Sequence, residues 1–269
     1  MKIGILIHQN DRRFIQSDYV INHQVKWWNR KYSIEIIRGL KHRPVVDLLI
    51  NHVDLTIMPD EYLDFMSSYE LVLNRNVVDI SKKKISANLV SQNSDYEGKV
   101  LVKPDLNDLG FPEYEMKSRI TRLVLKPIHY LTKSFDEKSQ FKIYDSIGDV
   151  PDKYFSNSKY VVEKYLPEYK DGLYYLRSFR FFGDRCLCST LGSKSQIIKG
   201  RNTVIRDDCT PPPEIFEYQK KFDFDFGKFD FTIYNGSVIL LDANKTPGYY
   251  SALDDETSKY LAEGLDSYL

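Results

Sequence analysis

The segment 227–248, GKFDFTIYNGSVILLDANKTPG, constrains the fold of this 269-residue chain more than any other. Two runs rich in β-branched and aromatic residues flank Asn235-Gly236, and such a dipeptide between two apolar runs is a strong signal for a β-hairpin. Side chains alternate between the two faces of a strand, so every second residue shares a face. The sequence therefore predicts two paired strands whose faces can be assigned from residue parity.

One face of this predicted hairpin carries charge in strands that otherwise look buried. Lys228 and Asp230 share a face of the first strand, and Asp242 and Asn244 share a face of the second. An ionised carboxylate in apolar surroundings costs several kcal/mol unless something compensates it. A hard divalent cation such as Mg²⁺ compensates it with oxygen ligands. The alternative is that Asp230 and Asp242 are edge-strand charges that face water.

Parity makes the metal site testable. A plain two-residue loop at Asn235-Gly236 would place Asp230 opposite Leu241, with Asp242 on the other side of the sheet. A shared ion needs both carboxylates on one face. We therefore predict a three-residue turn with a bulge and a left-handed Gly236.

Elsewhere, strands and helices alternate early in the chain and strands dominate later, which predicts an α/β (α+β) fold. Apolar patterning and turn residues give the expected elements. The further expected strands are 3–8, 33–38, 53–58, 70–75, 99–104, 140–144, 160–167, 174–183 and 186–192. The expected helices are one ending near Trp28, then 42–52, 62–66, one from Ser81 through Val90, 116–131, a short one from Pro151, and 254–268.

Composition excludes some classes of function. Lys plus Arg and Asp plus Glu both total 38, so the chain lacks the positive charge typical of nucleic-acid binders. No apolar run reaches the roughly 20 residues that span a bilayer, and the apolar start is too short for a secretory signal. The three cysteines cannot form a complete disulfide framework, so we expect reduced thiols and a cytoplasmic protein.

Four motifs in order resemble the ATP-grasp superfamily, in the branch of glutathione synthetase, D-alanine–D-alanine ligase and RimK-like ligases. LLDANKTPG at 240–248 resembles the family's metal strand, and KFDF at 228–231 resembles the strand that supplies the other metal carboxylate. VVEKYLP at 161–167 resembles the hinge that reads adenine, and VLVKP at 100–104 resembles the strand of the phosphate lysine. The resemblance implies a nucleotide held between two sheet-containing subdomains.

The resemblance also implies a division of the chain into an N-terminal α/β unit (1–78), a small ATP-grasp subdomain (79–166) and a C-terminal subdomain with the metal site (167–269). It implies specific residue roles, which we take as expectations. The expected ligands of one or two Mg²⁺ ions, or Mn²⁺, are Asp230, Asp242 and Asn244. The expected ATP-binding residues are Lys82, Lys103, Glu163, Lys164, Leu166 and, for the ribose, Asp171 in preference to Glu168. The expected catalytic cations are Arg177 and Lys228.

The implied activity is ATP- and Mg²⁺-dependent joining of a small-molecule carboxylate to an amine through an acyl phosphate, with a homodimer as a possible assembly. Two alternatives stay open, a phosphotransferase on the same fold and a nucleotide-binding protein without turnover. Asp242 stands where the family usually has Glu, and the segment after Lys103, PDLNDLGFPE, has a single glycine. Arg201 and Arg206 are candidates for an anionic substrate, with an exposed loop as the other interpretation.

Overall fold

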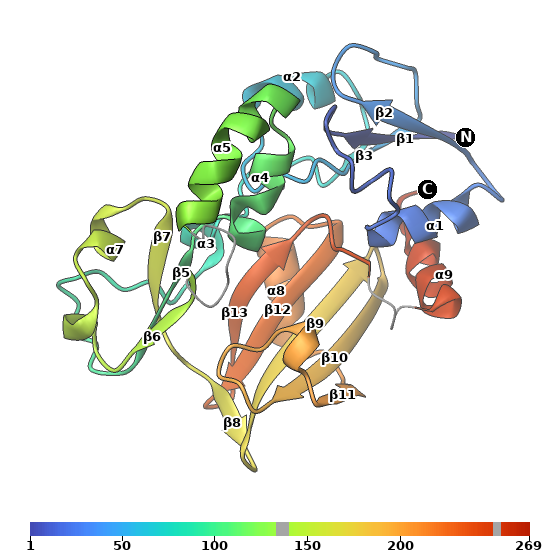
Figure 1. The fold of residues 1–269 in the computed structure, drawn as a ribbon. Helices are drawn as coiled ribbons and strands as arrows, with labels where there is room; N and C mark the ends of the chain where they lie inside the picture. The colour runs from blue at the N-terminus through green and yellow to red at the C-terminus, as the bar shows by residue number, and fades with distance from the viewer. Residues whose placement is uncertain (133–139, 250–253) are drawn as a thin grey trace.

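The computed structural model describes residues 1–132, 140–249 and 254–269, and its mixed α/β architecture confirms the predicted fold class (Figure 1). The described strands form three sheets of four, three and six strands. These sheets hold residues 2–73, 100–164 and 168–244 respectively. The domain boundaries at 78/79 and 166/167 stay predictions.

The first sheet is parallel, with the order β2-β1-β3-β4. Its elements are β1 (Lys2–Ile7), α1 (Val20–Trp28), β2 (Ser33–Arg38), β3 (Leu48–Asn51), α2 (Asp60–Ser67) and β4 (Val72–Leu73). The helix expected over 42–52 is wrong, because its second half is β3, and the strand expected over 53–58 is an irregular segment. Strand β3 is buried on both faces, so its residues do not alternate between apolar and polar. The sequence therefore lacks the pattern that would distinguish this strand from a buried helix.

The second sheet is antiparallel, with the order β6-β5-β7. This part contains α3 (Lys82–Ile85), β5 (Val100–Pro104), η1 (Asn107–Gly110), α4 (Phe111–Glu115), α5 (Arg119–Thr132), β6 (Lys142–Tyr144), η2 (Ile147–Asp149), α7 (Lys153–Ser156) and β7 (Tyr160–Lys164). The helix expected through Val90 is wrong beyond its first turn. The backbone is extended at Ser86, and the N–H of Val90 donates to Val162 O at 2.9 Å, so this segment runs along β7 instead.

The third sheet is antiparallel, with the order β11-β10-β9-β12-β13 and β8 added to β9. Its strands are β8 (Glu168–Lys170), β9 (Leu173–Phe182), β10 (Arg185–Ser193), β11 (Ile205–Asp208), β12 (Phe226–Tyr234) and β13 (Ser237–Asn244). The helices of this part are η3 (Gly200–Asn202), α8 (Pro213–Lys221), α9 (Asp255–Glu263) and η4 (Gly264–Tyr268).

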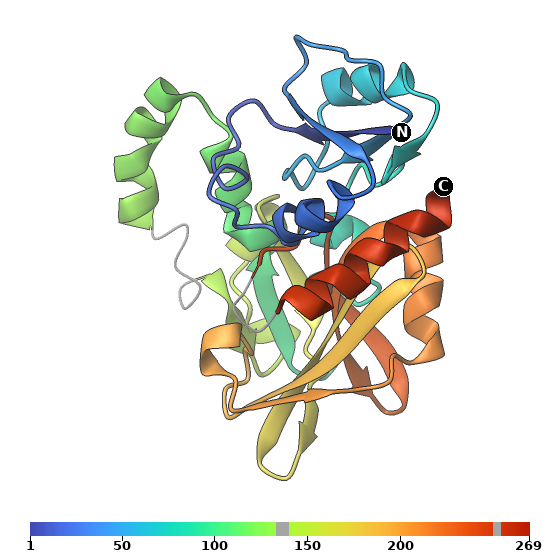
Figure 2. The same cartoon turned by 90° about the vertical axis from the view of Figure 1, so that its right-hand side faces the viewer.

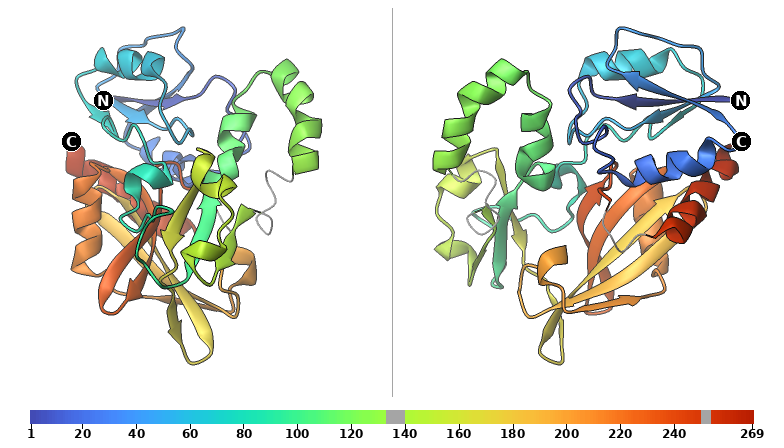
Figure 3. Two further views of the ribbon diagram at one scale, coloured as in Figure 1. Left: turned by 90° about the vertical axis from the view of Figure 1, so that its left-hand side faces the viewer. Right: turned by 45° about the vertical axis from the view of Figure 1, so that its right-hand side comes forward.

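Helices cover both faces of the third sheet (Figure 2). On one face, Ile215 of α8 packs in a cluster with Phe179 and Phe229. On the other face, Phe182 packs in a cluster with Trp28 of α1 and residues of α9, and these two helices lie between the first and third sheets (Figure 3). They cover only the end of the sheet near Phe182. The rest of that face is left for the second sheet and for the polar residues of β12 and β13.

In the hairpin of β12 and β13, Asp230 and Asp242 lie on one face as predicted, but the extra residue lies in a strand and not in the turn. Its loop is the two-residue type, with φ of +50° at Asn235 and +80° at Gly236, so the predicted three-residue turn is wrong. A bulge at Asp230/Phe231 then shifts the register by one residue, with Leu241 as the extra residue on β13. Asp230 therefore lies directly opposite Asp242, on one face, as predicted.

The segment after β13 is bonded to the N-terminal part of the chain. The Thr246 hydroxyl donates to Asp54 Oδ1 at 2.6 Å, and the Tyr19 hydroxyl donates to Asp54 Oδ2 at 2.7 Å. The backbone N–H of Val20 donates to Pro247 O at 3.0 Å. Buried carboxylates at this junction are held by hydrogen bonds, as burial of charge requires.

Asp11 at this junction gives a prediction about pH. It is fully buried, and burial raises its pKa to about 6, with Asp54 adding to the shift and the N–H of Phe14 opposing it. Between pH 4 and 6 the folded state keeps a proton that the unfolded state has released, so this carboxyl lowers stability as pH rises. We expect Asp11→Asn to raise the free energy of unfolding at pH 7 by up to about 3 kcal/mol, and to change it little at pH 4.

Urea unfolding at the two pH values measures this difference. Asp64→Asn, at an exposed position of α2, is the control for loss of a negative charge. An Asp11→Asn effect that is equal at pH 4 and pH 7 would contradict the assignment.

Candidate functional site

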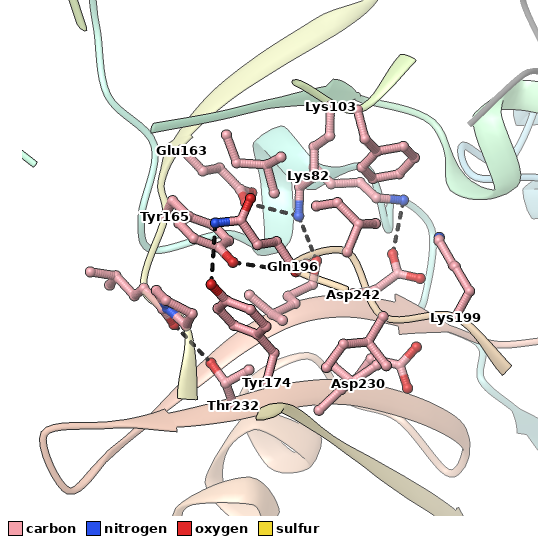
Figure 4. A pocket seen from close by; sticks show the side chains of 18 of the residues that line it. Lys82, Lys103, Glu163, Tyr165, Tyr174, Gln196, Lys199, Asp230, Thr232 and Asp242 are labelled. Atoms are coloured by element: carbon pink, nitrogen blue, oxygen red, sulfur yellow. Dashed lines mark hydrogen bonds and ion pairs between the residues drawn. The ribbon is translucent and has the colours of Figure 1, made fainter. Parts of the chain in front are cut away.

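A pocket lies between the second and third sheets, and its two ends differ in chemistry (Figure 4). The apolar end includes Leu101, Tyr165, Leu166, Tyr174 and Ile198. The polar end includes Lys82, Lys103, Lys199, Asp230 and Asp242. A pocket with a flat apolar end and a charged end suits a ligand with an aromatic ring and an anionic tail.

The boundary between the two ends is a buried ion pair. Lys103 of β5 and Glu163 of β7 lie on adjacent strands, with Nζ and Oε2 2.8 Å apart and side chains 5% and 3% exposed. Lys103 Nζ also donates to Leu241 O at 2.7 Å. The second oxygen of Glu163, Oε1, is buried and has no hydrogen-bond partner among the described residues. A buried acceptor without a donor is costly, so Glu163 Oε1 suits a ligand N–H.

A second lysine enters the polar end from the first turn of α3. Lys82 Nζ lies 2.8 Å from Asp242 Oδ1, and it also donates to Asn107 Oδ1. Burial raises the pKa of Asp242, but Lys82, Lys228 and Lys103 outweigh burial and leave the pKa below its ordinary value. Asp242 is therefore an anion at neutral pH, as a metal ligand must be.

The third lysine lies on β12 itself. Lys228 Nζ donates to Asp230 Oδ2 at 2.7 Å. Lys228 lies directly opposite Asn244, and Asp230 directly opposite Asp242, so these four side chains leave one face of the hairpin. The bulge at Asp230/Phe231 thus brings together all three expected metal ligands.

The donor set of this face fits a hard cation. Asp230, Asp242 and Asn244 offer carboxylate and amide oxygens, which are the ligand atoms that Mg²⁺ and Mn²⁺ prefer. Asp242 Oδ1 is buried and makes no well-aligned hydrogen bond with a described residue, although Lys82 lies near it. In the described ranges, no group of three or more His, Cys, Asp or Glu side chains is placed to hold a metal. An ion here would therefore need further oxygens from a bound phosphate or water.

The expected hinge residues line the apolar end of the pocket. Lys164 and Leu166 both lie there. The N–H of Lys164 donates to Asn88 O at 2.9 Å, and the carbonyl of Leu166 accepts from the Thr232 hydroxyl at 3.3 Å. The N–H of Leu166 has no acceptor among the residues that the structure describes. It is the backbone donor of the hinge that a ring nitrogen could use.

Four expected site residues do not line this pocket. Lys228 and Asn244 lie beside it, on the sheet face of Asp230 and Asp242, whereas Arg177 and Asp171 lie elsewhere. Arg177 lies opposite Phe231 on the other face of the third sheet, where its guanidinium binds Glu168 at 2.5 Å and the Thr190 hydroxyl at 3.2 Å. Asp171 is in the turn between β8 and β9, at the protruding tip in Figure 1. Glu168, the other ribose candidate, is occupied by Arg177 and by the N–H of Ile233.

Parity explains the placement of Arg177. Ser178, its neighbour on β9, is the residue opposite Asp230, so even-numbered positions of this strand face the pocket side. Arg180 shares that face and lies directly opposite Lys228, and it is only 9% exposed. The sequence analysis did not select Arg180. Once Ser178 is known to lie opposite Asp230, the alternation of side chains along β9 puts Arg180, two residues further on, on the same face.

The segment after β10 covers part of the apolar end. The hydroxyl of Tyr165 donates to Gln196 O, and the side chain of Gln196 donates to the hydroxyl of Tyr174, both at 3.3 Å. Figure 4 shows these three residues together at this end of the pocket. The substrate candidates Arg201 and Arg206 lie beyond this segment on η3 and β11, where both are exposed. They do not line the pocket.

The buried pair predicts strong energetic coupling. We expect Lys103→Met and Glu163→Leu each to lower the free energy of unfolding by about 3 to 5 kcal/mol, because each leaves its partner charge buried and unpaired. We expect the double variant to lose less than the sum of the two, by at least about 1 kcal/mol. Urea unfolding of the four proteins measures the coupling. Additive losses would show that the two charges do not stabilise each other.

Comparisons of the whole fold identify similar structures. No protein-family model matches the sequence, and no curated protein matches it. The RiPP-associated ATP-grasp ligase from Chryseobacterium gregarium, in complex with ADP and a leader and core peptide, is 11% identical with a TM-score of 0.55. This match covers 100% of the present chain and 98% of that ligase.

Two further solved structures agree with this match. The macrocyclase MdnC from Microcystis aeruginosa, bound with precursor peptide MdnA, is 12% identical with a TM-score of 0.51 and 98% of both chains covered. The RimK domain ATP-grasp protein from Sphaerobacter thermophilus is 7% identical with a TM-score of 0.50, over 98% of this chain and 99% of that one. The resemblance seen in the four sequence motifs is therefore confirmed at the level of the fold: this chain has the fold of the ATP-grasp proteins over nearly its whole length.

Proposed function

We propose that this protein is an ATP- and Mg²⁺-dependent ligase that joins a carboxylate to an amine through an acyl phosphate. The observation that carries the proposal is the polar end of the pocket, where Asp230 and Asp242 face each other among lysines. This end continues into an apolar end with a free backbone donor and a free acceptor. Such a pocket matches the two ends of ATP.

The apolar end fits adenine. Leu101, Ile198 and the ring of Tyr165 line it and can contact the faces of a purine. Glu163 Oε1 can accept a hydrogen bond from the exocyclic amine, and the N–H of Leu166 can donate to a ring nitrogen. These two groups are of opposite hydrogen-bond character, which would favour adenine over guanine at this position.

The polar end fits a triphosphate. Lys82 and Lys103 are buried cations at the pocket wall, where low water content strengthens their attraction for phosphate oxygens. Asp230, Asp242 and Asn244 would hold Mg²⁺, which when bound neutralises phosphate charge and orients the terminal phosphoryl group. Arg177 lies on the opposite face of the third sheet and Asp171 lies in the turn between β8 and β9, so we assign them no part in ATP binding or catalysis.

The chemistry that such a site supports is activation of a carboxylate. A carboxylate oxygen attacks the γ-phosphorus, the bond to the β–γ bridging oxygen breaks, and ADP leaves with that electron pair. The amine then attacks the acyl carbon, inorganic phosphate leaves, and the amine releases a proton. Lys228 and Arg180, on the same sheet face as Asp230, can neutralise the charge that develops on the phosphoryl oxygens.

The structural neighbours support ligation over the alternatives, because those with TM-scores of at least 0.5 include a ligase and a macrocyclase with bound peptides. A peptide carboxylate or amine is therefore a substrate class to test beside small molecules. The described helices include none that is long and apolar enough to cross a membrane.

Asp242 gives a direct test of the metal role. We expect ATP with Mg²⁺ to raise the melting temperature of the protein, because a ligand that binds only the folded state stabilises it. Asp242→Asn should remove the Mg²⁺-dependent part of this shift by taking away an anionic ligand. Asp64→Asn, at an exposed position of α2, should keep the full shift. A full Mg²⁺-dependent shift in Asp242→Asn would remove this residue from the metal site.

Product analysis separates the three candidate functions. A ligase should release ADP and phosphate in equal amounts only when a carboxylate and an amine are both supplied. A phosphotransferase should give ADP and a phosphorylated product without the amine. Binding of ATP with no ADP formed in any substrate mixture would indicate a nucleotide-binding protein without turnover.

A further inference from the structure

Two of the three cysteines are in direct contact at one edge of the third sheet. Cys188 lies on β10, and Cys209 directly follows β11. The backbone N–H of Cys209 donates to Cys188 O at 2.9 Å, which extends the pairing of Ser189 with Asp208 by one residue. Directly opposite residues of two paired strands share a sheet face. The sulfur of Cys209 accordingly lies 2.9 Å from the sulfur of Cys188.

The backbone at this pair suits a disulfide bond. The Cα atoms of directly opposite residues in antiparallel strands are about 4.5 to 5.5 Å apart. A disulfide needs Cα atoms about 4.4 to 6.8 Å apart and side chains that point toward each other. The strand pairing meets the first condition, and the contact of the two sulfurs meets the second. Both cysteines are free thiols in the structure, and joining them would need no large movement of the backbone.

The two thiols differ in their surroundings. Cys188 is buried in a cluster with Phe179, and burial, followed by the neighbouring Cys209, raises the pKa of its thiol. Cys209 is partly exposed, and the guanidinium of Arg177 lies beside it. Burial lowers the pKa of Arg177, but Glu168 and Cys209 raise it above its ordinary value. Reactive cysteines are typically partly exposed and next to a cation. Cys209 is therefore the thiol that an oxidant reaches first.

Cys186 provides a comparison within the same chain. It lies two residues before Cys188 on β10, so its side chain leaves the same face of the sheet. Among the described residues, the thiols of Cys188 and Cys209 are in contact and that of Cys186 touches neither. A soft-metal site does not explain the three thiols, because no group of His, Cys, Asp or Glu in the described ranges is placed to hold a metal.

The contact lies at the base of the segment that covers part of the pocket. Between the two cysteines the chain leaves β10 after Ser193, passes through 194–204 and returns as β11. Residues 196–199 of this segment line the pocket. Strand β11 is at the edge of the sheet, and three of its four residues are exposed. A bond between Cys188 and Cys209 would close the segment into a covalent loop and tie this edge strand to β10.

We infer that Cys188 and Cys209 form a reversible oxidation site, at which a peroxide converts the two thiols into a disulfide that closes the loop 188–209. None of the three cysteines lines the pocket, so this inference goes beyond the proposed ligase and does not depend on it.

The oxidation takes two steps. In the first, the sulfur of Cys209 attacks one oxygen of the peroxide and the O–O bond breaks. Cys209 becomes a sulfenic acid, and the other oxygen leaves as water with the thiol proton. In the second, the sulfur of Cys188 attacks the sulfur of Cys209 and the S–O bond breaks. The hydroxide takes the proton of Cys188 and leaves as a second water. Two thiols are thus oxidised, and one peroxide is reduced to two waters.

Thiol counting and peptide mapping test the inference on the full chain. Hydrogen peroxide is added to the reduced native protein, the free thiols are alkylated after unfolding, and mass spectrometry counts them. We expect three free thiols before oxidation, one after it, and three again after treatment with dithiothreitol. Digestion with trypsin without reduction should then give a bonded pair of peptides, 186–194 and 207–220.

Variants assign the bond, because peptide 186–194 carries two cysteines. Cys186→Ser should keep the bonded pair of peptides. Cys209→Ser, at a partly exposed position, should keep both of its remaining thiols through the same treatment. Cys188→Ser removes the thiol that attacks the sulfenic acid, so dimedone should label Cys209 in this variant. Cys209→Ser keeps the test informative if Cys188→Ser does not fold.

Five results would each overturn the inference. They are three free thiols in the wild-type protein after oxidation, thiols that dithiothreitol does not restore, a bond that is lost in Cys186→Ser, loss of both thiols in Cys209→Ser, and a bond between two chains on a non-reducing gel. All five would leave the proposed ligase intact, because the cysteines lie outside the pocket. Failure of ATP and Mg²⁺ to stabilise the protein would remove the ligase and leave the oxidation site.

Discussion

The one-residue register shift between β12 and β13 is the constraint on which the candidate site depends. Next to the loop, from Tyr234–Ser237 to Phe231–Leu240, the two strands pair as a two-residue turn dictates. If this register continued, Asp230 and Asp242 would lie on opposite faces of the sheet. The extra residue, Leu241, moves them onto one face and turns its own carbonyl to the ammonium of Lys103. A single bulge thus connects the proposed metal ligands to the lysine of the second sheet. Bulges near functional sites commonly redirect side chains in this way.

Much of the site could be predicted because its signals are local. Carboxylates at alternate positions of apolar strands identified Asp230 and Asp242, whereas Glu163 and Lys103 were expected only from the resemblance of their motifs to the ATP-grasp family. The prediction that an extra residue is needed to bring both carboxylates onto one face was also correct. The sequence could not show where the extra residue lies, because an extra residue in the loop and one in a bulge within the strand both put Asp230 and Asp242 on the same face. The structure has a two-residue turn at Asn235-Gly236 and a bulge at Asp230/Phe231.

The errors share a physical cause, which is that pairing partners are not visible in a single segment. The segment 42–52 was misassigned as a helix because a strand buried on both faces has the same apolar run as a buried helix. The helix at Ser81 was drawn too long because pairing with β7 takes over after Ser86. Arg177 was chosen for its charge, but which face of β9 points to the pocket depends on the register with β12. That register favours Arg180.

The hydrogen bonds of Thr246 and Pro247 to the N-terminal part have a consequence for protein engineering. Thr246 is bonded both to Asp54 and to Asn244, since its backbone N–H donates to Asn244 Oδ1 at 2.8 Å. Thr246 thus orients the amide of Asn244, the proposed metal ligand, and also bonds to the N-terminal part of the chain. A chimera that exchanges the N-terminal unit with a relative would have to transplant segment 246–249 together with residues 11–20 and 54. Grafting at the apparent sheet boundaries alone would separate donor from acceptor.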